Sequence, residues 1–468
     1  GNSATGATGL TAVGWSALKA NTSGLNNTAV GYEALLTNAD GDSNTAVGYK
    51  AMRLFEASSD GDGDNTALGN QAGYNNDTGE DNTYIGSNAG YGAAGANSGG
   101  QNTLVGHVAG KLVQGASTKN TIVGAGAGEH ITTGSHNAIL GYNSGGDGSA
   151  AGLGKTTLIG AYAGDAIDST DADGTVAVGY AALSANEDGR YNVAIGYEAM
   201  LTNVDGDKNT AVGYQALKTM EPNAGNSHNT AIGYQAGTLV TTGENNTFVG
   251  YTGIALTTGS DNVVIGTGAM TTANTNESRC VAIGRSALAV MDSDDGGTGS
   301  DGNMRTVAIG YNAGATLDTG YDNTIIGYNA GDGTDDGNFN TAVGTSALGA
   351  NCGNSNTAIG RQAGVIATGN YNTFVGALAG NTTAAADSNI CIGYNTECED
   401  ATATKQFIIG VNLNGTADEA VFIGDDGDHI RCDWGSDATW DKVSDKRKKN
   451  VLGDTSLGLD FINDLNTV

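Results

Sequence analysis

Short apolar runs bounded by Asn and Gly return along nearly the whole chain. The run Asn-Thr-Ala-Val-Gly-Tyr at residues 27–32 recurs at 44–49 and 209–214, as Asn-Thr-Ala-Ile-Gly-Tyr at 229–234 and as Asn-Thr-Ile-Ile-Gly-Tyr at 323–328. There are about 24 copies, most of them roughly 16 to 20 residues apart, as in solenoid repeats. This regular spacing predicts that each copy forms one coil of a repeating structure.

Within one copy, the pattern predicts two short strands joined by a bend. The β-branched run Thr28-Ala29-Val30 is typical of a strand, and alternation places Thr28 and Val30 on one face and Ala29 on the other. We expect the bulkier face, which carries Val30, to point inward. Residues 32–35 form the second expected strand. A polar turn, such as Thr-Thr-Gly at 132–134, then leads into the next Asn.

An aliphatic residue followed by Gly marks the register of each coil. A three-sided left-handed β-helix needs an aliphatic residue about every six positions, whereas this pair occurs once per coil and a small Ala follows. Two thin sides therefore fit better than three. The sequence predicts an all-β fold, a parallel β-roll or solenoid over residues 1–424. Clear register pairs are Val30-Gly31, Val47-Gly48, Val212-Gly213 and Ile232-Gly233.

The composition excludes an ordinary globular domain. The 468 residues include 77 Gly and a single Pro, with 6% aromatic and 15% charged residues. Collagen needs Gly at every third position and abundant Pro, and a disordered chain lacks a hydrophobic pattern. The recurring Val and Ile residues therefore favour an ordered, Gly-rich solenoid.

The chain is strongly acidic. Its 20 basic and 50 acidic residues leave a formal charge of -30, which phosphate backbones and anionic lipids would repel. No run approaches the roughly 20 apolar residues of a membrane helix. We therefore expect neither a nucleic-acid partner nor insertion into a membrane.

The cysteines do not form a recognisable pattern. The five thiols lie at irregular spacing, and no Cys-x-x-Cys motif is present. Isolated thiols are therefore favoured over a disulfide framework or a zinc site. The residues are Cys280, Cys352, Cys391, Cys398 and Cys432.

Each coil offers little apolar bulk to a core. Two or three small inward side chains do not offset the conformational entropy that a coil loses on folding. Packing against further copies of the chain would bury more surface, and identical repeats suit cyclic symmetry. We therefore expect a homo-oligomer.

The Asn-Thr-Ala-Val-Gly motif resembles the Asn-Ser-x-Ala-Ile-Gly repeat of the YadA-like heads of trimeric autotransporter adhesins. The likeness spans Thr11 to Gly424, although the coils here are longer, with insertions around residues 57–64 and 292–303. The resemblance implies a left-handed parallel β-roll wound as a homotrimer. It also implies an extracellular location and a surface that binds a host-cell glycan or protein.

The composition changes after Gly424. Residues 425–443 contain two of the three Trp residues and no repeat, so we interpret them as a neck or linker. Apolar residues at helical spacing over 454–465 predict a short amphipathic helix.

The only dense basic run of the chain lies between these two segments. Ser444, Asp445, Arg447 and Lys449 resemble the Ser-Asp-x-Arg-x-Lys opening of the intramolecular chaperone auto-processing domain of phage tail spikes and fibres. The resemblance implies trimerisation and one backbone cut beside Ser444, with Ser444 as the nucleophile and Lys449 as the general base. Residues 444–468 would then be the start of that domain. A basic linker is the alternative.

Acidic turns are the candidate cation sites. Asp60, Asp62 and Asp64 alternate with Gly and carry the oxygen ligands that calcium prefers. None of the acidic turns continues to the Glu of a helix-loop-helix calcium loop, and none repeats as the nonapeptide of calcium-binding rolls. Solvated turns are therefore favoured, calcium is the alternative, and no other cofactor is indicated.

Tyrosine follows the register Gly in many copies, for example at Tyr32, Tyr49 and Tyr214. Two interpretations are open. The rings line an outer groove and stack on sugars, or they cover the corner of each coil.

The repeat and the C-terminal motif together predict the structural fibre of a phage tail or tail-like particle, with a receptor-binding surface. The chain begins at Gly1 inside a repeat, so we expect other fibre or baseplate proteins on its N-terminal side. Apart from self-cleavage, we expect no enzyme activity. A bacterial trimeric autotransporter adhesin is the alternative, although it would end in a membrane barrel.

Two other functions receive less support from the sequence. A solenoid depolymerase would need clustered carboxylates in a widened coil, and the regularity of the repeats argues against one. An ice-binding solenoid would need outward ranks of Thr, whereas the motif Thr shares the face of Val that we expect to point inward.

Overall fold

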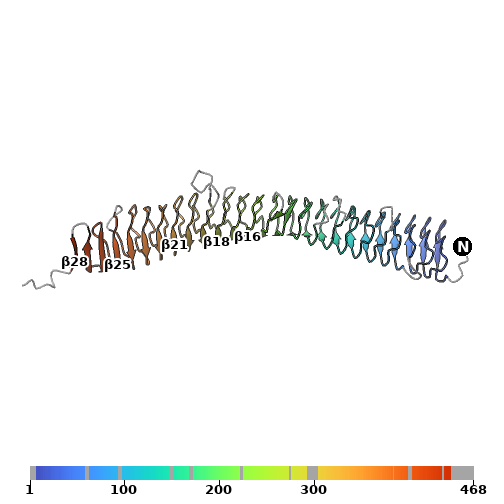
Figure 1. Ribbon diagram of the computed structural model, residues 1–468, viewed down its shortest axis with the longest axis horizontal. Helices are drawn as coiled ribbons and strands as arrows, with labels where there is room; N and C mark the ends of the chain where they lie inside the picture. Colours follow the sequence, from blue (N-terminus) through green and yellow to red (C-terminus); the bar gives the residue numbers. More distant parts are fainter. Residues whose placement is uncertain are drawn as a thin grey trace, which may run out of the picture. The chain divides into compact units, whose positions relative to one another are not determined.

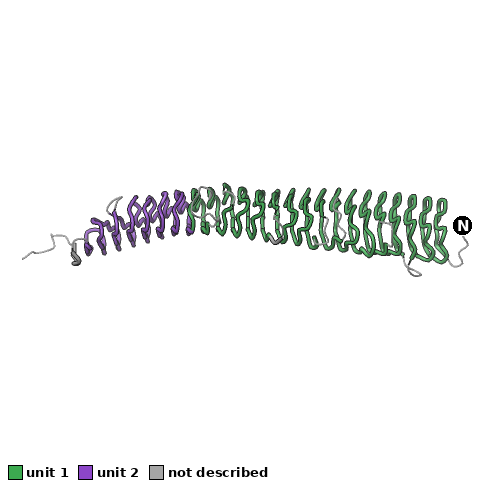
Figure 2. The backbone as a smooth tube through the Cα atoms, turned by 45° about the horizontal axis from the view of Figure 1, so that its top comes forward, with its two compact units in different colours: residues 1–321 green, residues 322–468 purple. Residues whose placement is uncertain are grey.

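The described part of the chain is an all-β parallel solenoid, as predicted. In this computed structural model the only regular elements of the described residues are strands. The chain forms two compact units, Gly1–Tyr321 and Asp322–Val468 (Figure 2). The structure describes residues 7–57, 63–92, 97–146, 152–167, 172–221, 225–272, 276–291, 304–382, 384–398, 403–434 and 437–443.

In the first unit, each coil contributes one three-residue strand, and successive strands pair in parallel (Figure 1). The register is residue for residue, with Thr28 opposite Thr45 and Val30 opposite Val47. A two-residue pair, β12 (Gly206–Asp207) and β14 (Gly225–Asn226), lies apart from the main sheet. The strands are β1 (Thr11–Val13), β2 (Thr28–Val30), β3 (Thr45–Val47), β4 (Thr66–Leu68), β5 (Thr83–Ile85), β6 (Thr103–Val105), β7 (Thr121–Val123), β8 (Ala138–Leu140), β9 (Thr157–Ile159), β10 (Val176–Val178), β11 (Val193–Ile195), β13 (Thr210–Val212), β15 (Thr230–Ile232), β16 (Thr247–Val249), β17 (Val263–Ile265), β18 (Val281–Ile283) and β19 (Val307–Ile309).

The second unit repeats this arrangement and then changes direction. Its parallel strands are β20 (Thr324–Ile326), β21 (Thr341–Val343), β22 (Thr357–Ile359), β23 (Thr373–Val375), β24 (Ile390–Ile392), β25 (Phe407–Val411) and β26 (Ala420–Asp425). Two antiparallel strands follow, β27 (Asp428–Asp433) and β28 (Asp437–Val443). The segment interpreted as a neck therefore forms two longer strands that extend the sheet.

The strand faces are opposite to the prediction. Ala29 is fully buried, whereas Thr28 and Val30 on either side of it are only half-buried. The alternation of the sequence identifies which residues share a face, but it does not say which face is inside. In the coil of β2 the opposite layer supplies Leu35, so the inward position takes the small Ala29 and the bulkier Val30 covers the outside. The register Val and Ile residues, including Val212 and Ile232, therefore point outward at the ends of their strands.

The second predicted strand is not a strand. Residues 32–35 form a turn in which Glu33 and Leu35 have left-handed backbone conformations, with φ of 53° and 48°. The segment still bonds from coil to coil, since the Leu35 N–H donates to the Ala51 carbonyl at 3.1 Å. Its side chains Ala34 and Leu35 are fully buried and face the strand layer. The opposite layer therefore stacks in register without extended backbone.

The motif Asn forms a buried ladder before most of the parallel strands. The Asn44 backbone N–H donates to Asn27 Oδ1 at 2.9 Å, and Asn44 Nδ2 donates to the same oxygen at 3.2 Å. Asn27 Nδ2 in turn donates to the Gly41 carbonyl at 2.7 Å, which holds the polar turn in place. Asparagine recurs because it satisfies both a turn and the next coil inside a buried space. Other members include Asn65, Asn82, Asn102, Asn120, Asn137, Asn192, Asn209, Asn229, Asn246, Asn262, Asn323, Asn340, Asn356, Asn372 and Asn389.

The register Gly is required by the close approach of successive coils. A Cβ atom on Gly31 would lie 2.2 Å from the carbonyl oxygen of Gly48, and the φ of Gly31 is 140°. Gly48 meets the next coil in the same way, at 2.1 Å from the Gly69 oxygen. Any side chain here would force the coils apart.

Large and small residues complement one another across the thin core. Where the inward strand residue is Ala29, the facing position is Leu35. Where it is Phe374, the facing position is Gly380, whose Cβ would lie 2.2 Å from the ring. The neighbouring coil also carries Gly364 against the same ring, at 2.6 Å. The Ala29–Leu35 and Phe374–Gly380 pairs have nearly the same total volume, and the Phe374 ring also fills the space that Ala358 and Gly364 leave in the neighbouring coil.

Candidate functional surfaces

Several predicted site residues lie outside the part of the chain that the structure describes. They are the proposed self-cleavage residues Ser444, Asp445 and Lys449, and two of the three calcium candidates, Asp60 and Asp62. The predicted helix at residues 454–465 also lies outside it. These predictions therefore stay predictions.

The described acidic turns bond to neighbouring turns. The third calcium candidate, Asp64, donates its backbone N–H to the Asp42 carbonyl at 3.2 Å. The Asp42 carboxylate accepts the Leu25 N–H at 2.6 Å. Hydroxyl groups of Ser23 and Thr22 donate to Asp40 and lower the pKa of its carboxyl group. Among the described residues, no group of three or more His, Cys, Asp or Glu side chains converges as a metal site.

The outer face of the strand layer is an uncharged stripe of Thr and aliphatic side chains. We define the outer stripe as the first and third residues of the three-residue strands, which include no charged residue. Its aliphatic members are unusually exposed, with Val13 at 58% and Leu140 at 48%. Exposed apolar side chains that gather on one face are typical of interaction sites in proteins. Further exposed members are Leu68, Ile85, Ile159, Ile195, Ile232, Ile326 and Ile359.

Tyrosine rings form a ladder along the corner after the register Gly. From Tyr180 to Tyr234, neighbouring rings stack with centroids 5.1, 5.2 or 5.3 Å apart. Because these four rings cover one another's faces, a ligand would meet their edges and hydroxyl groups rather than open faces. This arrangement favours a cover for the coil corner over a platform for stacked sugars. The ladder comprises Tyr142, Tyr162, Tyr180, Tyr197, Tyr214, Tyr234 and Tyr251.

A polar row supports the tyrosine ladder. Glu198 accepts Lys218 Nζ at 2.7 Å and Gln215 Nε2 at 2.9 Å. These contacts lower the pKa of the Glu198 carboxyl group, and the hydrogen bond to Glu198 raises the pKa of Tyr197. Glu33 and Arg53 form a similar ion pair at 2.6 Å near Tyr32. At both places the contacts tie neighbouring coils together, and the carboxylates are engaged by cations and an amide.

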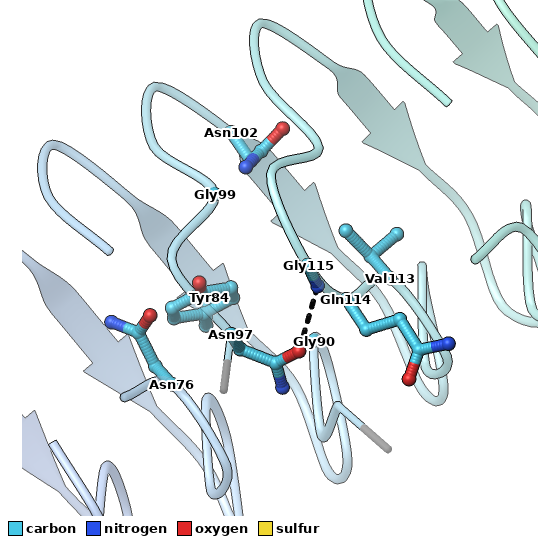
Figure 3. A pocket seen from close by; sticks show the side chains of 9 residues that line it. All are labelled: Asn76, Tyr84, Gly90, Asn97, Gly99, Asn102, Val113, Gln114 and Gly115. Atoms are coloured by element: carbon cyan, nitrogen blue, oxygen red, sulfur yellow. Dashed lines mark hydrogen bonds between the residues drawn. The ribbon is translucent and has the colours of Figure 1, made fainter. Parts of the chain in front are cut away.

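An interior hollow lies beside the buried ring of Tyr84 (Figure 3). Asn97 Oδ1 accepts the Gly115 N–H at 3.1 Å at its edge. The other lining residues are mostly Gly and uncharged amides, and burial raises the pKa of Tyr84. The hollow therefore lacks a pair of acid and base groups. A second, polar groove crosses exposed turns and is lined by Thr78, Glu80, Asp81, Ser98, Gly100, Gln101 and Thr118.

The five thiols are all buried, and two of them are not isolated as predicted. Cys391 Sγ lies 3.3 Å from Cys398 Sγ. The residues are only seven positions apart, but alternation alone did not reveal that they face one another across the core. The Cys352 thiol instead lies 3.4 Å from Thr334 Oγ1, and burial raises the pKa of Cys280 to about 12.

Comparison with known proteins identifies no relative. No family model matches the sequence, and no curated protein is similar to it. The fold and its surfaces therefore carry the information about the function of this protein. The described residues contain no helix with the length and apolar character needed to cross a membrane. The class that the structure does define is a fibre-like β-solenoid built from short repeats, which is consistent with a structural protein.

Proposed function

We propose that three copies of this chain wind together into an extracellular fibre that presents a host-binding surface, as the tail fibre of a phage or tail-like particle. The observation that carries the proposal is the outer stripe. Its Thr and aliphatic side chains recur in register on successive coils, so each unit presents an uncharged face along its stack. A symmetric assembly buries such a face continuously.

Charge supports the choice of this face for assembly. A formal charge of -30 on each chain makes copies repel one another, so their contact must avoid the acidic turns. The outer stripe contains no charged residue and therefore permits close approach. The acidic turns and the tyrosine ladder would remain outside, where the host surface binds.

The C-terminal motif favours a phage-type fibre within the class of trimeric fibres. Its support is the resemblance of Ser444, Asp445 and Lys449 to the auto-processing chaperone, which also assists trimerisation. In the natural full-length protein, we expect one cut beside Ser444 and none in Ser444→Ala. A bacterial trimeric adhesin remains the alternative. An uncut full-length protein would remove the support for the phage assignment without affecting the trimer.

Light scattering with size-exclusion chromatography tests the assembly. A trimer would have a mass of about 140 kDa, three times the 46.7 kDa of one chain. Leu140→Asp places a charge in the outer stripe and is expected to weaken the trimer. Glu187→Lys in an exposed turn is the matched control and should leave the mass unchanged. A stable monomer of the unmodified chain would overturn the proposal.

Ice binding is a second candidate, because the motif Thr points outward and not inward as expected. Thr28, Thr45 and Thr66 stack in register on the outer stripe. Regular outward hydroxyl and methyl groups are what an ice-binding face needs. However, Val replaces this Thr in several strands, including Val176 and Val263, which suits packing against protein better. Thermal hysteresis in a solution of the purified chain would favour ice binding, and its absence would exclude it.

A further inference from the structure

The coil of β24 holds two thiols in contact across its core. Cys391 is the central, inward residue of β24, and Cys398 lies on the opposite layer of the same coil. Their sulfur atoms are 3.3 Å apart, and the two residues are 0% and 5% exposed. The separation exceeds a disulfide bond by little more than 1 Å, so a small side-chain movement would join them.

Neighbouring coils hold the backbone beside Cys398. The Glu397 N–H donates to the Leu413 carbonyl at 2.9 Å in one neighbouring coil. The Glu397 carboxylate accepts the backbone N–H groups of Asn381 and Thr382, both at 3.0 Å, in the other. The position of Cys398 opposite Cys391 is therefore set by contacts in both directions along the stack.

The two residues that fill the core of the β24 coil differ from the pairs found in most other coils. In most other coils, an inward Ala faces Leu or Met, or a bulky residue faces Gly, as Phe374 faces Gly380. In the β24 coil, the segment after the register Gly carries Thr396 and Glu397 where other coils have an apolar residue or Gly. The thiols of Cys391 and Cys398 meet in the core in place of such a pair. Two facing sulfur atoms replace the usual apolar complement.

We propose that Cys391 and Cys398 form a disulfide that ties the two layers of this coil together. With glutathione disulfide as the oxidant, one thiolate attacks the oxidant and releases one glutathione. The second cysteine then attacks the mixed disulfide and releases the other. One Sγ–Sγ bond forms in the protein, the oxidant's S–S bond breaks, and two protons pass to the two released thiols.

The bond is expected to form mainly while the chain folds. Both thiols are buried in the completed coil, so glutathione disulfide has little access to them. The contact with Cys398 and burial also raise the pKa of Cys391 well above its usual value, which disfavours the reactive thiolate. Oxidation should therefore be much faster during refolding than in the folded protein.

Peptide mass analysis of the full chain refolded with glutathione disulfide tests the proposal. Trypsin leaves both cysteines, and no other, in the peptide 362–405. Its mass should fall by about 2 Da when the bond forms, because two hydrogen atoms are lost. Further cleavage after Glu397 should leave two peptides that separate only on reduction. Alkylation of the oxidised, denatured chain should label three of its five cysteines.

Matched variants distinguish this bond from a general effect of oxidation. Both Cys391→Ser and Cys398→Ser should abolish the mass change, whereas Cys352→Ser should keep it. The oxidised chain should also melt about 2–5 °C above the reduced chain, and neither pair variant should show this difference. Labelling of all five cysteines after oxidative refolding, or a bond between a different pair, would overturn the proposal.

Discussion

Two coils of this solenoid fill the same narrow interior in opposite ways. In the coil of β2, the small Ala29 points inward from the strand and Leu35 from the facing turn. In the coil of β23, Phe374 points inward and the facing turn carries Gly380. The strand backbone has the same length and register in both. Coil geometry is therefore set by backbone features that both coils share, while the division of volume between layers is free to vary.

The largest loss of stability is expected from removing the large side chain of the Phe374–Gly380 pair in the β23 coil. Phe374→Ala should leave a cavity and destabilise the protein by about 3–5 kcal/mol. The double variant Phe374→Ala/Gly380→Leu recreates the Ala and Leu pair of the β2 coil and should recover much of this loss. Urea unfolding followed by circular dichroism measures both values. If the double variant is as unstable as the sum of the single variants, the two positions do not compensate for each other.

Replacing the register Gly should cost the same stability in coils with an inward Ala and in coils with an inward Phe. An added Cβ would lie 2.1 Å from a carbonyl oxygen at Gly48 and 2.2 Å at Gly376. Each change to Ala should therefore cost about 2–4 kcal/mol, from clash and from strain at positive φ. Gly427→Ala is the control, because φ there is also positive but a Cβ would meet no atom within 4 Å. A similar cost at Gly427 would show that strain, and not close approach, selects Gly.

Removing one member of the asparagine ladder should have a smaller effect that is again the same in both kinds of coil. Asn340→Ala removes the acceptor of the Asn356 N–H, a bond of 2.8 Å, and the donor to the Gly353 carbonyl. We expect a loss of about 1–3 kcal/mol, because buried backbone groups lose their partners. Asn372→Ala should match it, whereas Asn338→Ala, in an exposed turn of the same coil, should cost far less. Equal costs for all three variants would contradict a special role for the ladder.

The smallest effect should come from acid titration of the row beside the tyrosine ladder. Contacts with Lys218 and Gln215 lower the pKa of folded Glu198 below its ordinary value of 4.5. The stabilisation is therefore fully present above the unfolded pKa and is lost as pH falls through the lower, folded pKa. Glu198→Gln should melt about 1 °C lower than the parent protein at pH 7, and the difference should shrink as pH falls below 4.5. A difference that stays constant with pH would mean that the charge of Glu198 makes no contribution.

The cysteines and the aromatic residues show why the sequence did not predict every contact. The pattern located the strand that contains Cys391, but it did not predict the path of the segment that carries Cys398, in which Asn395 is left-handed and Glu397 forms a parallel bridge with Asn414. In the coil of β23, left-handed conformations at Leu378 and Gly380 bring Gly380 against Phe374. Left-handed backbone conformations occur at residues such as Glu33 and Leu35, whose residue types do not favour them. They could therefore not be predicted from the sequence.

By itself, the sequence determined the repeat, the position of the one strand in each repeated coil, the all-β class and the residues that mark the register. These follow from local periodicity and from Gly and Asn, whose backbone and side-chain chemistry is distinctive. Only the tertiary structure decided that Ala29 is inside and Val30 outside, since two faces of one strand are equivalent until a second layer packs on one of them. That choice turned the aliphatic side chains outward and made them the surface on which the proposed assembly depends.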